Sequence, residues 1–472
     1  MSAVHVSPFS GTWYPAQAVA LERLLEERFE CSRRRTGPFL LSNAVGFVVP
    51  HAGPEYSGVV ASAVYRSLQQ NPPDRIVLLA FPHYGGLRGV AVPKVRAIAT
   101  PLGPVPVDGF LSDRFPRAEE AQVCDHSFEI QLPFLQKAVP NTRVCPLYVG
   151  SMAETERRAF AEALADEWRP GTVLLASSDF THYGRGFGYV PFPADSQVAE
   201  HLRALDTECM DAAGSLDPGF FLQALAETGA TVCGAAPIAL LLSAVSLICP
   251  DCLFQTTLDY QTSGEITGDF RHTVSYAALG YFPRSAFELN PEDAEALLMS
   301  AEQTLERLRE TGNRDPIRAR GSAALESRRG VFVSLHDDTE LLGCMGQCSG
   351  REPLADAVPE MALAAALEDP RFHPGDAVAR QYQMEISVLT PLRRIRAPAD
   401  FEIGRHGALL KLGFAAGLLL PQVARPGWSS ADFLDALSRK AGLPAQAYQD
   451  PAARLSVFEA QILNQTKLTP YY

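Results

Sequence analysis

Three short apolar segments constrain the fold of this chain more than any other feature. They are VGFVVP, RIVLLA and TVLLAS, at residues 45–50, 75–80 and 172–177. Each is hydrophobic at consecutive positions, which is the pattern of a strand buried on both faces. Such strands belong to parallel sheets flanked by helices. Because helix-like and strand-like segments alternate up to about residue 284, we expect an α/β domain with a mainly parallel sheet.

A histidine follows each of these segments within a few residues. His51 and His83 follow the first two, and Asp179 and His182 follow the third. The chain has only ten histidines, so the strand ends hold a large share of them. Ligands of open α/β sheets bind beyond the carboxyl ends of the strands. If the three strands are neighbours, the imidazoles meet there and can share one metal ion.

Two further segments carry residues of the same chemistry. DHSFEIQLPFL places Asp125, His126 and Glu129 at a helix start. His126 and Glu129 are three residues apart and share a helix face, whereas Asp125 is also a suitable N-cap. Cys233 precedes an apolar helix whose dipole favours a thiolate, the alternative being a small buried side chain. Two imidazoles with a thiolate or carboxylate make a three-ligand site compatible with iron(II), copper or zinc.

The composition excludes several classes of partner. At 472 residues the chain is long enough for two or three domains. A net charge of −13 without a strongly basic segment argues against nucleic acid as a partner. The apolar run AAPIALLLSAVSLI has 14 residues and predicts a buried helix rather than a membrane span. The N-terminus lacks the features of a signal peptide, so we expect a cytoplasmic protein.

The cysteines do not follow a disulfide pattern. There are nine, an odd number scattered over a large chain, which predicts reduced thiols. Cys249 and Cys252 form a lone C-x-x-C motif, and three residues separate Cys344 from Cys348. Without a second pair beside either, redox activity or metal binding at these positions stays open.

A domain boundary follows the strand-like segment HTVSYAALGYF. The next segment, FPRSAFELNPED, contains two prolines, and Asn290 caps a helix expected over 291–310. Beyond it, a hairpin is expected around Asp337–Asp338, followed by further helices and strands. We therefore expect an α/β domain at 1–284 and a smaller α+β domain at 285–472.

Several segments of the first domain resemble the signature motifs of the MEMO family. In chain order they are SGTWYP, HAGPEYSG, DHSFEIQLPFL, SSDFTHYG, TVCGAAPI and QTSGEITGD. The resemblance covers about residues 3–284. That family is similar in fold to the class III extradiol (LigB-type) non-haem iron dioxygenases, which implies a three-layer domain with a metal pocket.

This resemblance implies roles for six side chains. The implied metal ligands are His51, His83 and Cys233. The implied catalytic residues beside them are His126, Asp179 and His182. Iron(II) is the favoured ion, with copper or zinc as alternatives. Cys233 stands where the dioxygenases use a carboxylate, so the resemblance alone does not imply ring-cleaving activity. Ala235 and Ala236 stand where many relatives carry Arg and His, so the resemblance implies no substrate contact from those positions.

The second domain resembles the AMMECR family over roughly residues 291–470. The similar segments are LLGCMGQ, DPRF, EISVLTPL, GRHGALL, GLLLPQVA and FLDALSRKAGL. The residues left to line a cleft are Cys344, Glu385, Arg405 and His406. A core position is the alternative for Cys344, and a surface ion pair with Glu402 is the alternative for Arg405.

Two differences separate this domain from its relatives. Leu342 stands where an Arg usually precedes the Gly-Cys pair, and Ser438 stands where the late helix usually has Cys. If those residues carry chemistry in relatives, part of it is lost here. The two families joined in one chain resemble the AmmeMemoRadiSam pairing, which implies a radical S-adenosylmethionine enzyme as partner. A fusion holds both modules at high effective concentration.

Three functions are compatible with these residues. The first is a metal-dependent, dioxygenase-like enzyme acting on a small molecule or a modified residue. In it His126 or His182 transfers protons, and Asp179 orients a histidine through its second ring nitrogen. The second is a metal carrier or a peptide-binding adaptor for the radical enzyme, and the third places the activity in the AMMECR half. The oligomeric state, including a homo-oligomer, stays open. We expect His51→Ala to abolish metal uptake without unfolding, because its loop is expected outside the core.

Overall fold

The structure is a computed structural model that divides into two compact units. It describes residues 4–38, 41–84, 86–250, 252–337, 340–464 and 468–469. The units are residues 1–286 and 287–472, a division close to the predicted boundary.

The first unit alternates strands with helices. Its helices are α1 (Ala18–Thr36), α2 (Gly58–Gln70), α3 (Glu120–Val123), α4 (His126–Glu129), α5 (Gln131–Ala138), α6 (Glu154–Glu167), α7 (Val198–Gly214), α8 (Pro218–Thr228), α9 (Ala235–Ile248) and α10 (Ser263–Thr267). Its strands are β1 (His5–Val6), β2 (Gly46–Val49), β3 (Arg75–Ala80), β4 (Val90–Pro93), β5 (Ala97–Thr100), β6 (Gly103–Pro106), β7 (Arg117–Ala118), β8 (Arg143–Val149), β9 (Thr172–Ser177), β10 (His182–Gly184), β11 (Leu253–Thr262) and β12 (His272–Pro283).

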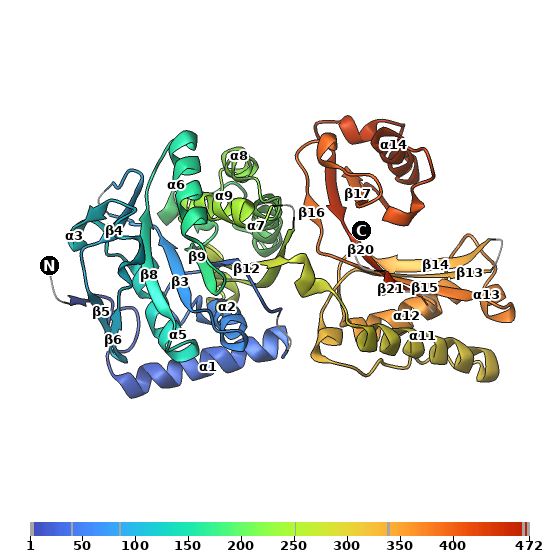
Figure 1. The fold of residues 1–472 in the computed structure, drawn as a ribbon, viewed down its shortest axis with the longest axis horizontal. Helices are drawn as coiled ribbons and strands as arrows, with labels where there is room; N and C mark the ends of the chain where they lie inside the picture. Colours follow the sequence, from blue (N-terminus) through green and yellow to red (C-terminus); the bar gives the residue numbers. More distant parts are fainter. Residues whose placement is uncertain are drawn as a thin grey trace. The chain divides into compact units, whose positions relative to one another are not determined.

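The three apolar segments form the centre of the main sheet. The strand order is β10-β12-β2-β9-β3-β8-β4-β7, with β11 paired to β12. Strands β2, β9, β3 and β8 are parallel neighbours, whereas β12 runs antiparallel to β2. The prediction of adjacent parallel strands is therefore confirmed. Since β2 and β3 flank β9 and run parallel to it, the carboxyl ends of all three strands lie at the same edge of the sheet (Figure 1).

Helices cover both faces of this sheet and complete a three-layer α/β domain (Figure 1). On one face α9 approaches β2 so closely that a Cβ at Gly46 would lie 2.9 Å from a methyl group of Leu241. On the other face α2 packs between its neighbours: a Cβ at Gly58 would meet Arg28 of α1 and Phe134 of α5. Close packing of this kind places the hydrophobic core between the sheet and its helices.

Helix α9 is the apolar run that the sequence predicts to be buried. Its residues from Pro237 to Leu242 are all buried in the core. No helix in the described part of the chain combines the length and hydropathy needed to cross a membrane.

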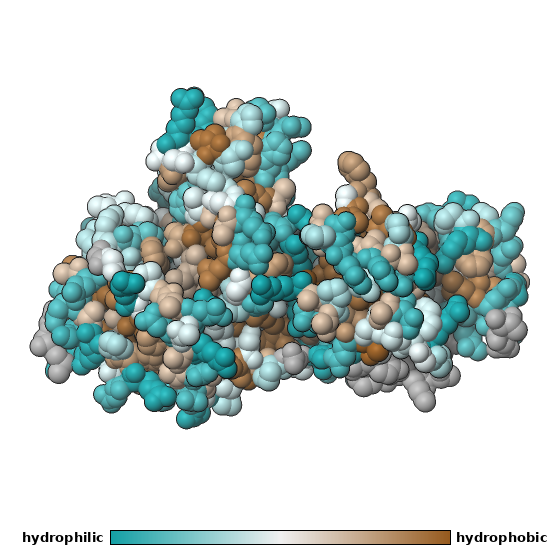
Figure 2. All heavy atoms as spheres, turned by 90° about the horizontal axis from the view of Figure 1, so that it is seen from above, coloured by the Kyte–Doolittle hydropathy of each residue, from teal (hydrophilic) through white to brown (hydrophobic). Residues whose placement is uncertain are grey.

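On the face drawn in Figure 2, hydrophilic and hydrophobic side chains are interspersed.

The second unit is an α+β domain, as predicted. Its helices are α11 (Pro291–Thr311), α12 (Leu354–Leu367), α13 (Asp376–Ala379) and α14 (Ser430–Lys440). Its strands are β13 (Val331–His336), β14 (Leu341–Gln347), β15 (Gln383–Leu389), β16 (Arg393–Arg394), β17 (Gly407–Leu412), β18 (Ala415–Leu419), β19 (Arg454–Phe458), β20 (Ala460–Asn464) and β21 (Leu468–Thr469). One antiparallel sheet has the order β14-β13-β15-β20-β21 and packs against α12, and the other has the order β16-β19-β17-β18 and packs against α14.

Local sequence signals place several of these elements. Helix α11 begins where Asn290 accepts a hydrogen bond from the Asp293 amide at 2.8 Å, and it ends at Gly312, whose φ is +73°. These are the N-cap and the left-handed C-terminal glycine of a well-bounded helix. The predicted hairpin is present as the antiparallel pair β13–β14. Asp338, at its expected turn, lies outside the described residues.

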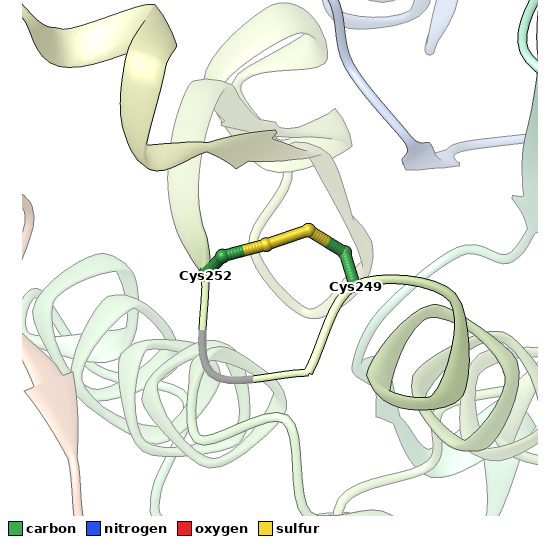
Figure 3. The surroundings of a disulfide bond; sticks show 2 residues. All are labelled: Cys249 and Cys252. Atoms are coloured by element: carbon green, nitrogen blue, oxygen red, sulfur yellow. A yellow bond between two sulfur atoms is a disulfide. The ribbon is translucent and has the colours of Figure 1, made fainter.

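The prediction of reduced thiols is wrong for one pair of cysteines. Cys249 and Cys252 form a disulfide (Figure 3). Cys249 caps the end of α9 and Cys252 directly precedes β11, and their Cα atoms are 5.8 Å apart. That separation is within the range a disulfide spans. The other seven cysteines are free thiols.

Candidate metal centre

The ends of β2 and β3 and the start of α9 bring His51, His83 and Cys233 together. One potential ligand atom from each lies within 4.8 Å of those of the other two. His51 Nε2 is 3.1 Å from Cys233 Sγ. The rings of His51 and His83 have their centroids 5.3 Å apart and are nearly perpendicular, at 85°. The three residues predicted as ligands therefore converge on one point beyond the strand ends.

The hydrogen bonds of Ser177 fix the tautomer of His51. The Ser177 hydroxyl donates to the Ser127 carbonyl, so its oxygen can only accept from His51 Nδ1 and Gln131 Nε2, each at 3.0 Å. The His51 proton is therefore on Nδ1, and the lone pair on Nε2 faces Cys233. Burial lowers the pKa of His51 well below its ordinary value, and neighbouring imidazoles add to this effect. His51 is consequently neutral, as a metal ligand must be.

Asp125 fixes the tautomer of His83 in the same way. Its carboxylate lies 2.9 Å from His83 Nδ1 and also accepts the His83 amide at 3.1 Å. Burial opposes ionisation of Asp125, but the hydrogen bond from His83 and nearby imidazoles outweigh it and lower its pKa. An ionised carboxylate only accepts, so Nδ1 of His83 carries the proton and Nε2 is free. Asp125 also caps α4 by accepting the Ser127 amide at 2.9 Å, as predicted.

The orienting role predicted for Asp179 is wrong. The Asp179 carboxylate accepts hydrogen bonds from the backbone amides of His51 at 2.8 Å and Ala52 at 3.2 Å. The carboxylate that orients the ring of His83 belongs to Asp125 instead. Asp179 thus holds the loop after β2 in place. Burial raises the pKa of Asp179, an effect that the charge of His182 opposes.

Cys233 is a half-buried thiol held by its surroundings. Burial raises the pKa of Cys233 above its ordinary value, and the charge of Asp179 adds to the increase. Desolvation therefore outweighs the expected effect of the helix dipole, and the thiol proton is available to His51 Nε2. The Asp179 amide donates to Sγ at 3.3 Å. Gly234 allows this approach, because a Cβ there would lie 2.4 Å from Cβ of Ser178.

His126 lies beside His51, His83 and Cys233 but is not one of these three predicted ligands. Its ring stacks on His83 with centroids 4.1 Å apart, and Trp13 covers it at 4.5 Å. Burial lowers the pKa of His126 to about 4, although the charge of Asp125 opposes the decrease. His126 is therefore neutral near pH 7. The contact with Trp13 was not predicted, although SGTWYP is among the segments that carry the family resemblance.

His182 stands at the start of β10, outside the three-ligand group. Its Nδ1 is 2.9 Å from the carbonyl oxygen of Thr231, and its amide donates to the Thr231 hydroxyl at 2.8 Å. A carbonyl oxygen only accepts, so Nδ1 carries a proton, and Nε2 is the ring nitrogen left for another partner. The charge of His182 contributes to the lowered pKa of His51, so the two rings influence each other.

In the second unit, Cys344 and Glu385 share one face of a sheet. Both pair with Ser334 of β13, from the strands on either side, so their side chains point the same way. The Ser334 hydroxyl donates to Cys344 Sγ at 3.2 Å, and Gln422 Nε2 donates to Glu385 at 2.9 Å. The half-buried thiol is thus neither a core residue nor fully exposed.

Arg405 and His406 have other partners. Arg405 forms ion pairs with Glu402 at 2.9 Å and with the buried Glu459 at 2.8 Å, which confirms the alternative of a pair with Glu402. His406 is buried and accepts the Glu402 amide at 3.0 Å. These contacts stabilise the turn before β17.

Known proteins share both halves of this architecture. A family model described as Memo-like protein matches residues 7–280, more than half of the chain. The chain belongs to the Memo-like protein family. A second model, AMMECR1, matches residues 298–463, so this Memo-like protein carries an AMMECR1 domain in its second unit.

Relatives of the Memo-like part occur in archaea and animals. A MEMO1 family protein of Methanosarcina acetivorans is 34% identical over 280 residues, covering 57% of this chain and 96% of that protein. The protein memo-1 homolog of Caenorhabditis elegans is 28% identical over 247 residues, covering 50% of this chain and 69% of its own. Among solved structures, an uncharacterized protein from Pyrococcus horikoshii is 32% identical, without assignment to either unit; the match covers 37% of this chain and 92% of that protein, with a TM-score of 0.35.

Proposed function

We propose that this Memo-like protein is a metal-dependent enzyme whose ion is held by His51, His83 and Cys233. The reaction class is oxidative chemistry on a small molecule or a modified residue. Iron(II) is the favoured ion, and copper or zinc also suits two imidazoles and a thiolate. Three protein ligands leave coordination positions open for substrate or water.

One observation supports this proposal above the others: the second ring nitrogens of both histidines are already occupied. Ser177 holds Nδ1 of His51 and Asp125 holds Nδ1 of His83. Both Nε2 lone pairs are thereby available beside the Cys233 thiol. Metal-binding histidines characteristically have such partners on the far nitrogen. The thiol proton, which now faces His51, is the group that an ion would displace.

A bound ion would supply Lewis acidity, and iron or copper would add redox chemistry. The protein supplies proton transfer around it. His182 is positioned for this transfer, because Thr231 holds its Nδ1 and Nε2 is the ring nitrogen left for a substrate. His126 is neutral at physiological pH, but its pKa of about 4 makes it a weak base.

The deciding experiment is elemental analysis of anaerobically purified protein. Wild type, Cys233→Ser and Cys31→Ser are compared, the last as a control because Cys31 is exposed and remote in sequence. Iron or copper that is present in the wild type and the control, but lost in Cys233→Ser, supports the proposal. Zinc in the same pattern redirects it to metal-assisted hydrolysis. Absence of metal from all three proteins overturns it and favours a peptide-binding adaptor.

We further propose that the partner is a radical S-adenosylmethionine enzyme. The fusion of a Memo-like and an AMMECR1 domain supports this, since a fused chain places two activities of one process together. Calorimetric titration of the full chain with a radical enzyme from the same organism tests it. Saturable binding that an unrelated radical enzyme does not reproduce is the expected result, and absence of binding contradicts the proposal.

A further inference from the structure

A second group of metal-ligating side chains lies in the first unit. His5 of β1, Cys124 at the end of α3 and Glu129 of α4 each offer one ligand atom, and these atoms lie within 4.8 Å of one another. None of them belongs to the group of His51, His83 and Cys233. The three come from segments far apart in the chain, since 124 positions separate His5 from Glu129.

Glu129 is the buried charge of this group. Its side chain is 1% exposed, and Oε1 lies 3.0 Å from His5 Nε2. The other oxygen, Oε2, is buried and has no hydrogen-bond partner. A carboxylate withdrawn from water normally has every oxygen paired or bound to a metal. An ion pair with His5 accounts for only one of the two oxygens.

The surroundings of His5 match those of a metal-bound imidazole. Nε2 faces Glu129, and Nδ1, on the opposite side of the ring, lies 3.7 Å from Oε2 of Glu120. A carboxylate near the far nitrogen orients a ligand histidine and strengthens it as a donor. The contact between His5 Nε2 and Glu129 Oε1 is a hydrogen bond in the metal-free protein, and an ion bound at Nε2 would take the place of the proton between them, with Nδ1 directed at Glu120.

The donor set selects the type of ion. Nitrogen, sulfur and carboxylate oxygen together are typical ligands of zinc and atypical of magnesium or calcium, which prefer oxygen alone. Zinc bonds of about 2.0–2.3 Å place tetrahedral ligands roughly 3.3–3.8 Å apart. The present separations, 3.0 Å for the His5–Glu129 pair and at most 4.8 Å within the group, require only small side-chain adjustments.

We propose that His5, Cys124 and Glu129 form a second metal site, of the zinc type, that ties strand β1 to the segment around α4. The fourth position is open to water or to Glu120. The ion satisfies the unpaired oxygen of Glu129 and joins the N-terminal strand to the segment that also carries Asp125 and His126. The site has a structural role and does not depend on the activity proposed for the first centre.

The test uses full-length, metal-stripped protein in a Cys233→Ser background and Co²⁺ as the probe. A thiolate bound to cobalt gives a charge-transfer absorption band. Because the Cys233→Ser background removes the thiolate of the first centre, any band must come from another cysteine. We expect Cys233→Ser to show the band on Co²⁺ titration and to lose it when Zn²⁺ is added. Cys233→Ser/Cys124→Ser should lack the band, and Cys233→Ser/Cys31→Ser, the matched control, should keep it.

Glu129→Gln provides a second variant that retains the side-chain volume. In the Cys233→Ser background it should weaken Co²⁺ binding by more than about tenfold, with an unchanged circular dichroism spectrum. A band of equal strength with and without Cys124, or no band in folded Cys233→Ser protein, would overturn the inference. Since the first centre is tested by loss of Cys233 and the second by loss of Cys124, either proposal can fail while the other stands.

Discussion

Nε2 of His51 lies 3.1 Å from Sγ of Cys233, although 182 positions separate the two residues in the sequence. The imidazole lone pair of the buried His51 and the thiol proton of the half-buried Cys233 face each other. The contact is therefore a hydrogen bond in the metal-free protein and becomes a pair of adjacent ligands once the proton leaves. Most properties expected of the first centre follow from this exchange of a proton for a metal ion.

The first prediction is that metal binding at this centre strengthens as pH rises. Burial raises the pKa of Cys233, so the thiol is protonated at neutral pH and binding must release its proton. Affinity should increase by about tenfold per pH unit below the thiol pKa. Isothermal titration calorimetry in buffers of different ionisation enthalpy measures the release. A pH-independent affinity would show that the thiol is not a ligand.

The second prediction concerns His51→Ala, which should abolish metal uptake. The sequence places His51 in a loop outside the core, but the side chain is 1% exposed, so that expectation is wrong. We therefore also expect a loss of roughly 1–3 kcal/mol in unfolding free energy from the cavity. Chemical denaturation measures it, with His373→Ala, at an exposed histidine, as control. Full metal occupancy in His51→Ala would remove His51 from the ligand set.

The third prediction separates the two roles of Asp125. Asn caps helices as well as Asp does, so Asp125→Asn should retain α4. It removes the negative charge beside His83 Nδ1, and metal affinity should fall by about 10- to 100-fold. Asp217→Asn, the same change at the N-cap of α8, should leave affinity unchanged. Equal affinities in both variants would mean that Asp125 serves the helix alone.

The fourth prediction tests the close approach of α9 to β9. Gly234→Ala places a methyl group against Ser178 and the Ser177 carbonyl, at 2.4 and 2.6 Å, so backbone must shift. Thermal stability should fall and metal affinity with it, because Cys233 is the adjacent residue. Gly109→Ala, whose added methyl meets only Ser112 at an ordinary 3.4 Å, is the control. Unchanged metal affinity in Gly234→Ala would show that Cys233 does not depend on this contact.

The fifth prediction concerns the AMMECR1 domain. Cys344 is half-buried and accepts a hydrogen bond from the Ser334 hydroxyl, whereas Cys31 is exposed and Cys145 is buried. Labelling of the native protein with a thiol reagent, followed by peptide mass spectrometry, should modify Cys31 first, Cys344 more slowly and Cys145 last. Rapid labelling of Cys344, at the rate of Cys31, would instead favour an active thiol in this half of the chain.

The main sheet is predictable from sequence because burial on both faces leaves a continuous apolar pattern. The segments of β2, β3 and β9 show it, and the histidines that follow them could be placed at one edge. The partners of those histidines could not. Ser177 and Asp125 reach His51 and His83 through side-chain contacts across 126 and 42 positions, which no local pattern encodes.

Short polar segments were predicted less well for a similar reason. In the segment QTSGEITGD, Thr262 and Glu265 form a capping box that starts α10, a helix that was not predicted from the sequence. Glu129 lies three residues after His126 in α4, as predicted, but its contact with His5, 124 positions away, has no local signal. The disulfide between Cys249 and Cys252 depends on the approach of their Cα atoms after α9, which spacing alone does not predict.

The segment from Cys124 to Glu129 serves both groups of ligands. Asp125 and His126 contact His83, and the residues at the two ends contact or approach His5. If both centres hold ions, any effect of one ion on the affinity for the other must be equal in both directions, by thermodynamic linkage. Through these six consecutive residues, metal binding beside strand β1 would then change how fully the centre of His51, His83 and Cys233 is occupied by its own ion.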